Sequence, residues 1–304
     1  MSDAQLYHLP VLLKQSVDAL RVGAGGTYVD ATFGGGGHSR EVLRRMSDRG
    51  HLYSIDQDAD ALANAAGMET DERFTLLRGN FRFLGNFLRY EGVTQVDGIL
   101  ADLGVSSHQF DEGRRGFSFR FDAPLDMRMN QRASRTAADV VNGYDERQLA
   151  KLFRLYGELR PASALAKALV RAREQAPITT TGQLATLASG VLGRMGGSNL
   201  PRVFQALRIE VNDELGALRQ MLKQAVRLLR PGARLVVITY HSLEDRLVKN
   251  LIRTGNCEGE AAVDFYGNVH TPLRAVGKPI TPSEEEIGAN PRSRSARLRV
   301  GEKI

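Results

Sequence analysis

The sequence predicts an α/β protein in which a doubly wound parallel sheet is interrupted by a mostly helical insertion. Short apolar strands alternate with helical segments over residues 27–103, the alternation stops between 106 and 200, and it resumes with the continuous apolar run at 235–240. Strands that alternate with helices of this length are typical of βαβ units, which join parallel strands by right-handed crossovers. The run at 235–240 is typical of a central strand that is buried on both faces.

The first part of the chain contains the strands that carry the most distinctive residues. A β-rich run at 27–33 stops at the four glycines 34–37 and precedes a helical pattern from Ser39 to about Arg49. The further predicted elements are a strand at 51–56 with a helix over 58–66, a strand at 73–78 with a helix after it, and a strand at 96–103. Two of these strands end in acids, Asp56 and Asp102.

The middle of the chain is predicted to be helical, with segments near 146–157, 162–174 and 181–193. A long amphipathic helix follows, and the spacing of its apolar positions is typical of one helical face. These positions are Val203, Leu207, Val211, Leu215, Leu218, Leu222, Val226 and Leu229. The pattern predicts a sheet domain at 1–108 and 206–304 and an inserted, mostly helical domain at 109–205.

The end of the chain completes the predicted sheet. Pro231 and Gly232 end the long helix, and another helix begins near Leu243, after the buried strand. A polar stretch covers 255–294, and the last apolar segment, 296–300, is expected to pair as an antiparallel edge strand.

Composition excludes several classes of protein. The chain has 304 residues, of which 42% are apolar and 25% charged, as in an average folded globular protein. No apolar run is long enough to span a bilayer and no signal peptide is indicated, so we expect a cytoplasmic protein without a membrane partner. With one cysteine, Cys257, and six scattered histidines, neither a disulfide nor a metal site is expected.

Positive charge is concentrated in the middle of the chain. Residues 109–205 contain 15 Lys and Arg against 9 Asp and Glu, which equals the whole net charge of +6. An excess confined to one segment is what binding to a polyanion requires, although solvated helix faces also often carry arginine.

The glycines at 34–37 and Asp56 predict a nucleotide-like ligand at the carboxyl ends of the strands. Glycines let the backbone approach a ligand closely, and Asp56 is placed to accept hydrogen bonds from ribose hydroxyls. These two features alone fit either a dinucleotide or S-adenosylmethionine.

Three further residues favour S-adenosylmethionine. Ser39 stands where the G-x-G-x-x-G fingerprint requires its third glycine. Asp30 lies just before the loop, where it either holds the loop or meets an ammonium group, and Asp102 ends a strand beside the expected site. Acids fit a cationic methionine moiety better than a pyrophosphate, because like charges repel.

Eight short motifs follow one another along the chain. They are YHLPVLL at 7–13, DATFGGGGHS at 30–39, IDQD at 55–58, DLGVSS at 102–107, RGFSF at 115–119, PLDMRM at 124–129, FQALRI at 204–209 and HSLEDR at 241–246. Over nearly the whole chain, this ordered set resembles the MraW family of bacterial small-subunit ribosomal RNA cytosine-N4 methyltransferases. The resemblance implies a class I S-adenosylmethionine methyltransferase (Rossmann-like) sheet with an inserted helical domain that recognises RNA.

The resemblance also implies a reaction and its site. The cofactor would be S-adenosylmethionine, and the methyl acceptor would be the exocyclic N4 of a cytidine in the decoding region of 16S RNA within the 30S subunit. The residues implied to bind the cofactor are Gly36, Gly37, His38, Asp56, Phe81, Asp102 and Gln109. The cytosine N4 lone pair is delocalised into the ring, so N4 is a poor nucleophile until the amino group is polarised or loses a proton. A group of the enzyme must accept that proton, and Asp102 is the candidate catalytic residue.

The substrate is expected to meet two regions of the chain. Tyr240 and His241 end the late apolar strand, where both are expected to stack on the base or orient it. The alternative for His241 is a hydrogen bond that positions a neighbouring residue of the site. The loop at 114–128 offers Arg114, Arg115, Arg120 and Arg128 to phosphates. Its phenylalanines 117, 119 and 121 either stack on bases or form a satellite hydrophobic cluster over the sheet.

Other functions remain open on the sequence alone. A methyltransferase of the same fold could act on DNA or protein, and a non-catalytic RNA-binding assembly factor could retain the cofactor pocket. The sequence also leaves open whether the chain forms a homodimer.

Overall fold

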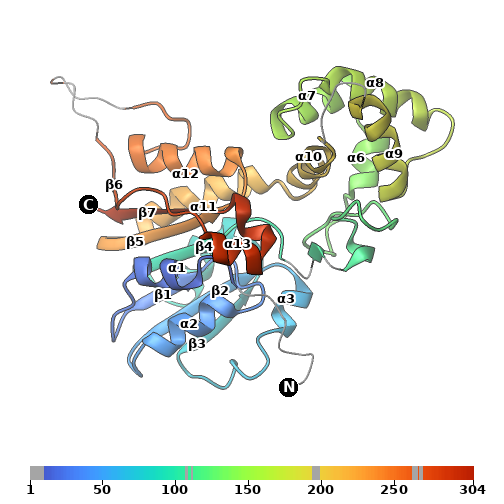
Figure 1. Ribbon diagram of the computed structural model, residues 1–304. Coiled ribbons are helices and arrows are strands. Elements are labelled where there is room, and N and C mark those ends of the chain that lie inside the picture. The colour runs from blue at the N-terminus through green and yellow to red at the C-terminus, as the bar shows by residue number, and fades with distance from the viewer. Residues whose placement is uncertain (1–9, 107–108, 111, 194–198, 262–265, 267–269) are drawn as a thin grey trace. The chain divides into compact units, whose positions relative to one another are not determined.

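The computed structural model describes residues 10–106, 109–110, 112–193, 199–261, 266 and 270–304. The chain forms two compact units (Figure 1), of which the first contains residues 1–104 and 215–304 and the second residues 105–214. The insertion therefore covers a longer segment than the 109–205 of the sequence prediction. Residues 7–9 and 107 of the family motifs lie outside the described residues.

The first unit is built on a seven-stranded sheet with the order β3-β2-β1-β4-β5-β7-β6. Its strands are β1 (Thr27–Asp30), β2 (His51–Asp56), β3 (Phe74–Arg78), β4 (Val96–Asp102), β5 (Leu229–Thr239), β6 (Leu273–Ala275) and β7 (Arg297–Lys303). Strands β1 to β5 are parallel, and β7 is antiparallel to both of its neighbours. This is the predicted doubly wound sheet, and residues 235–239 of β5 are all buried, as expected for a central strand.

One strand prediction is wrong in detail. The last strand pairs antiparallel with β5 as expected, but it is not an edge strand, because β6 pairs with its other side. Strand β6 lies inside the polar stretch at 255–294, and its three residues are too few to give an alternating pattern in the sequence.

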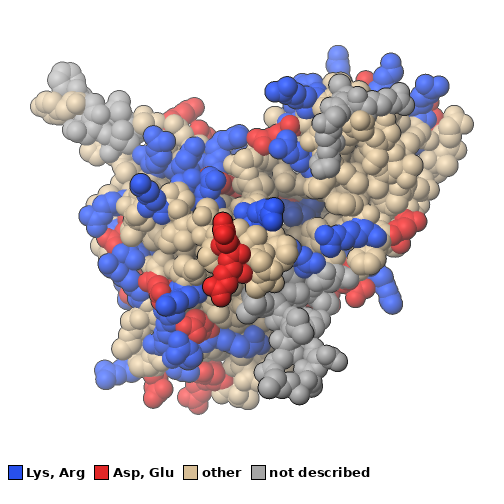
Figure 2. Space-filling model, viewed as in Figure 1, with Lys and Arg blue, Asp and Glu red and all other residues tan. Residues whose placement is uncertain are grey.

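Helices cover both faces of the sheet. Their bounds are α1 (Leu13–Leu20), α2 (Gly37–Arg45), α3 (Ala59–Ala63), α4 (Leu84–Tyr90), α11 (Glu214–Leu228), α12 (Ser242–Thr254) and α13 (Glu284–Ala289). The crossovers through α2 and α3 step along the sheet in one direction, and those through α4, α11 and α12 step in the other. Right-handed crossovers therefore place α11 and α12 on the face opposite α2. Lys and Arg side chains gather on the surface around α12 (Figure 2).

The second unit is helical and has its own hydrophobic core, which includes Leu149, Phe153 and Leu165. Its helices are α6 (Ala137–Gly143), α7 (Glu146–Tyr156), α8 (Ala162–Arg173), α9 (Thr181–Leu192) and α10 (Leu200–Asn212). The sequence prediction missed α6, a seven-residue helix that begins with a capping box between Thr136 and Asp139.

The predicted long amphipathic helix is two helices. Asp213 has a left-handed backbone conformation with φ 47°, and it separates α10 from α11. Val203 and Leu207 of α10 belong to the core of the second unit, whereas Leu218 and Leu222 of α11 are buried in the first. The apolar periodicity runs through the break, so periodicity alone could not reveal it.

No helix in the described part of the chain is long and apolar enough to cross a membrane.

Candidate active site

The glycine loop after β1 has two different halves. A Cβ atom at Gly34 or Gly35 would meet nothing within 4 Å, so the space beside these residues is open. A Cβ atom at Gly36 would lie 2.8 Å from the Phe33 ring, and one at Gly37 would overlap the Pro10 ring. Close packing favours glycine at 36 and 37, a left-handed backbone with φ 52° and 74° favours it at 34 and 36, and the space beside 34 and 35 is left open.

Asp56 lies at the end of β2 and ties this strand to the loop. Its Oδ2 accepts a hydrogen bond from the Gly34 N–H at 2.8 Å, and its Oδ1 accepts one from the Asp58 N–H at 2.9 Å. The Gln57 backbone also hydrogen-bonds this carboxylate, so of its roughly four acceptor sites about one is left for a ligand hydroxyl. Burial raises the pKa of Asp56 to about 6.

Phe81 is brought close to this strand end by pairing between β2 and β3. The Gly79 N–H donates to the Asp56 carbonyl at 2.8 Å, and Asn80 Nδ2 donates to Gln57 Oε1 at 2.9 Å. Phe81 follows directly and is partly exposed. The carboxylate and the aromatic ring predicted to bind ribose and adenine therefore come from neighbouring strand ends.

Asp30 is fully buried beneath the glycine loop. Its Oδ2 accepts a hydrogen bond from Ser39 Oγ at 2.6 Å, and its Oδ1 accepts one from the Thr32 N–H at 3.1 Å. Burial raises its pKa to about 7. Of the two roles that the sequence left open for Asp30, these contacts support holding the loop.

Asp102 lies at the end of β4, between a tyrosine and a histidine. Its Oδ1 accepts a hydrogen bond from the Tyr240 hydroxyl at 2.8 Å, and its Oδ2 lies 3.8 Å from His38 Nδ1. Burial raises the pKa of Asp102 to about 7; the Tyr240 hydrogen bond opposes this shift, while the charges of Asp30 and Glu244 add to it.

His38 is neutral at physiological pH. Its Nε2 lies 3.2 Å from the Val11 carbonyl oxygen, which can only accept, so Nε2 carries the proton and Nδ1 presents a lone pair toward Asp102. Burial lowers the pKa of His38 to about 4. The ring therefore supplies no positive charge that would hold Asp102 ionised.

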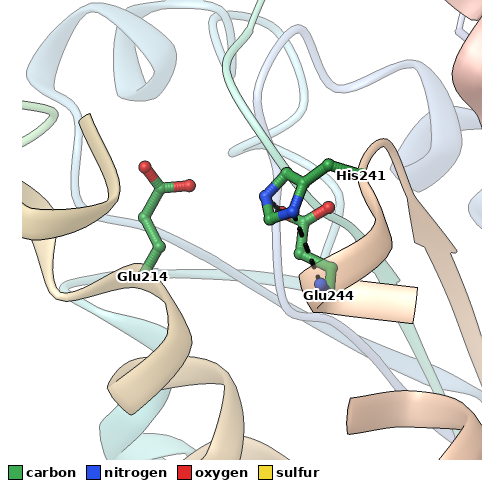
Figure 3. A group of neighbouring side chains, drawn as sticks. All are labelled: Glu214, His241 and Glu244. Carbon is green, nitrogen blue, oxygen red and sulfur yellow. Dashed lines mark hydrogen bonds and ion pairs between the residues drawn. The ribbon is translucent and has the colours of Figure 1, made fainter. Parts of the chain in front are cut away.

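His241 contacts its own helix. It is the N-cap of α12, its Nδ1 lies 3.5 Å from the Glu244 nitrogen, and its Nε2 lies 3.2 Å from Glu244 Oε1 (Figure 3). Glu244 in turn accepts a hydrogen bond from the Tyr240 N–H at 2.9 Å. These contacts support the positioning role that the sequence gave as one alternative for His241.

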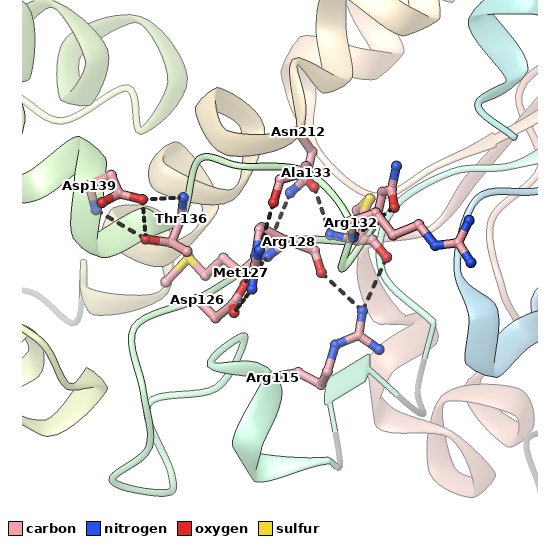
Figure 4. A network of polar contacts seen from close by, with 11 residues as sticks. Arg115, Asp126, Met127, Arg128, Arg132, Ala133, Thr136, Asp139 and Asn212 are labelled. Atoms are coloured by element: carbon pink, nitrogen blue, oxygen red, sulfur yellow. Dashed lines mark hydrogen bonds and ion pairs between the residues drawn. The ribbon is translucent and has the colours of Figure 1, made fainter.

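Two of the four arginines expected to bind RNA are used inside the second unit (Figure 4). Arg115 is buried, and its Nη2 donates to the carbonyl oxygens of Arg128 and Met129 at 2.9 and 3.2 Å. Arg128 holds Asp126 through two hydrogen bonds of 2.8 and 2.7 Å. The burial of Arg115 and its bonds to this loop favour a structural role over the expected phosphate contact. The sequence signal for Arg114 and Arg115 is the same, and only burial separates them.

The remaining predicted residues of the second unit differ in exposure. Arg114 and Arg120 are exposed, and Arg114 approaches Glu112 only at 3.8 Å. Phe117 is buried in the core of this unit, Phe119 packs edge-on against Phe204, and Phe121 is half exposed. Phe117 and Phe119 thus form part of a hydrophobic cluster, but it lies in the core of the insertion.

Gln109 is buried in the second unit, where its Oε1 accepts a hydrogen bond from the Ser106 N–H at 3.1 Å. Sequence reasoning did not identify two residues that hold the site in the first unit. Thr32 Oγ1 accepts from the Asp102 N–H at 2.6 Å, and Glu244 holds the Tyr240 backbone. Both lie inside family motifs, at 30–39 and 241–246, which is the only signal that could have found them.

Comparison with known proteins identifies the family of this chain. The ribosomal RNA small subunit methyltransferase H of Phocaeicola vulgatus is 58% identical over 306 residues, with all of both chains covered. The protein of the same name from Bacteroides fragilis strain YCH46 is 58% identical over 299 residues, which are 98% of this chain and 97% of the relative. That of Flavobacterium johnsoniae is 52% identical over 305 residues, with all of both chains covered. The model of the MraW methylase family matches residues 5–304. The chain therefore belongs to the MraW methylase family.

Proposed function

We propose that this methyltransferase transfers the methyl group of S-adenosylmethionine to the exocyclic N4 of a cytidine in the decoding region of 16S RNA, within the 30S subunit in the cytoplasm. Family membership and the names of the relatives support an enzyme that methylates small-subunit ribosomal RNA. The observation that carries the choice of an amino group is Asp102, a carboxyl with a pKa of about 7 at the end of β4.

The residues of the first unit fit S-adenosylmethionine. The open space beside Gly34 and Gly35 admits a ligand close to the backbone, the Asp56 carboxylate has room to accept from a ribose hydroxyl, and Phe81 offers a ring for adenine. Asp102 gives the site a carboxyl that attracts a cation when ionised. When bound, the sulfonium supplies an activated methyl group with a good leaving group.

Asp102 is proposed to accept the proton that N4 loses. The Asp102 carboxylate would take up the proton that N4 loses when it accepts the methyl group that bound S-adenosylmethionine would supply. A base works best when its pKa lies near the working pH, and a value of about 7 meets that condition. His38 Nδ1 lies 3.8 Å from Asp102 Oδ2, and the neutral ring brings no positive charge that would oppose protonation of this carboxylate.

Tyr240 is proposed to hold Asp102 in place through its hydroxyl. Much of the rate acceleration of such an enzyme comes from holding nitrogen, methyl and sulfur in line. Tyr240 is therefore a positioning residue, and its backbone is itself held by Glu244.

The second unit is proposed to bind ribosomal RNA through its exposed arginines. Arg114, Arg120 and Arg132 are exposed, as is the aromatic ring of Phe121. Arginines contact phosphates and aromatic rings stack on unpaired bases, which is how folded RNA presents a reachable base.

Methyl incorporation tests this function. Labelled S-adenosylmethionine is offered with isolated 30S subunits, naked 16S RNA, DNA or protein, and the modified RNA is digested to nucleosides. We expect label in 30S subunits as N4-methylcytidine from the decoding region. Label in DNA or protein would replace this substrate assignment, and absence of transfer despite RNA binding would favour a non-catalytic assembly factor.

A further inference from the structure

A row of basic residues runs along the exposed side of α11. Arg219, Lys223 and Arg227 follow one another at four-residue spacing, so they lie on one side of the helix, and all three are exposed. After Glu214 the helix contains no acid. Neighbouring members of the row are about 6 Å apart along the helix axis.

A second basic row lies on α12. Arg246 and Arg253 are exposed and Lys249 is partly exposed. The two acids of this helix, Glu244 and Asp245, lie in its first turn. Glu244 is buried, and Asp245 is bound by Arg297 and Arg299. Beyond the first turn of α12, all charged side chains are therefore basic.

The two rows lie on one surface of the first unit, because right-handed crossovers place both helices on the same face of the sheet. Arg219 and Lys223 also act electrostatically on Cys257, three residues after the end of α12, as does the acid Glu258. Figure 2 shows Lys and Arg side chains gathered around α12.

This surface is not explained by the net charge of the chain. Outside residues 109–205 the basic and acidic residues are equal in number, so the first unit is close to neutral overall. Elsewhere in that unit, ion pairs neutralise cations, as in Arg44 with Glu41 and Arg230 with Asp97. Among the residues that the structure describes, no ion pair is formed by Lys223, Arg227 or Arg253. Folding therefore separates positive charge onto the α11 and α12 surface.

We propose that the α11 and α12 surface binds phosphates of the small-subunit RNA, as a contact separate from the arginines of the second unit. A cationic surface without exposed aromatic or large apolar side chains suits a phosphate backbone. A membrane surface is a poorer match, because none of the large hydrophobic residues exposed in the described part of the chain lies on α11 or α12. This inference rests on the proposed function.

The test compares two variants with equal loss of charge. The first variant, Lys223→Gln/Arg227→Gln/Arg253→Gln, neutralises the proposed surface. The control variant, Lys14→Gln/Arg44→Gln/Arg49→Gln, removes three exposed cations on or next to α1 and α2, on the opposite face. Binding of both full-length proteins to 30S subunits is measured between 50 and 200 mM salt, about the range over which counterion release is visible.

We expect the first variant to lower the salt slope of log affinity by about two, since each lost phosphate contact changes it by roughly 0.7 to 0.9. The same relation gives a loss of affinity of roughly a hundredfold at about 0.1 M salt. The control should stay within about threefold of the unmodified protein, and S-adenosylmethionine affinity should be unchanged in both.

Three outcomes would overturn the inference. The first is an unchanged salt slope in the first variant. The second is an equal loss of 30S affinity in the control variant, which would indicate only a net-charge effect. The third is a loss of binding to anionic vesicles in the first variant that equals its loss of 30S affinity. If the unmodified protein methylates 30S subunits while the first variant binds them normally, the surface assignment fails and the proposed function stands. If the unmodified protein methylates no RNA, the proposed function fails.

Discussion

At the scale of single residues, the chemistry depends on Asp102. Replacing it by Asn keeps the size and removes the proton acceptor, so we expect single-turnover methyl transfer to slow by roughly 10² to 10⁴-fold while S-adenosylmethionine affinity is largely retained. The unmodified protein should show a rate that rises with pH and levels off above a pH of about 7, the pKa of Asp102. The variant should lack this rise.

Tyr240→Phe is the matched control, because it leaves the carboxyl in place. The Tyr240 hydroxyl lowers the pKa of Asp102, so loss of this hydroxyl should move the rise in rate to higher pH. An unchanged rate for Asp102→Asn at saturating cofactor would show that Asp102 is not in the proton path.

Asp30 makes a prediction about stability. Its pKa is about 7 in the folded protein, against about 3.9 for an ordinary aspartate, so the folded state binds this proton more tightly than the unfolded state. The free energy of unfolding should therefore fall as pH rises from about 4 to about 7, by at most about 1.4 kcal/mol per pH unit for this carboxyl, and stay level above.

Asp30→Asn should remove this part of the pH dependence, because Asn does not titrate. The variant can keep the local structure, since Asn can accept from Thr32 and the Ser39 hydroxyl can then donate to the Ser54 hydroxyl, 2.8 Å away. Urea unfolding at several pH values measures the difference between the two proteins. Asp48→Asn, at an exposed position, is the control. Parallel pH dependence in the unmodified protein and Asp30→Asn would contradict the prediction.

At the scale of an element, α6 shows how a short helix is stabilised. Thr136 Oγ1 accepts from the Asp139 N–H at 3.2 Å, and Asp139 Oδ2 accepts from the Thr136 N–H at 2.8 Å. Thr136→Ala should therefore lower the free energy of unfolding by about 1 kcal/mol, and Thr136→Ser should lower it much less. Denaturant unfolding of both variants checks this; equal losses would assign the effect to the threonine methyl group.

At the scale of the whole molecule, the arginines of the second unit should separate into two groups. Arg114→Gln/Arg120→Gln/Arg132→Gln should weaken RNA binding and flatten its salt dependence without loss of stability, because these side chains are exposed. Arg115→Gln should instead destabilise the protein by roughly 1 to 3 kcal/mol, since it leaves two carbonyl oxygens without their donor. Titration with 30S subunits and thermal unfolding distinguish these effects. Normal RNA binding by the triple variant would direct the search for the RNA surface to the first unit.

The sequence by itself determined the parallel sheet, the glycine loop and the acids Asp56 and Asp102 at the strand ends, because each depends on residues close together in the chain. Only the tertiary structure decided which polar groups meet. Tyr240 reaches Asp102 across 138 residues, and Arg115 is enclosed by carbonyl groups of its own loop, whereas Arg114 beside it stays in solvent. It likewise showed that Asp213 divides a continuous apolar pattern between two cores. Burial and pairing follow from packing between distant segments, and no local pattern carries that information.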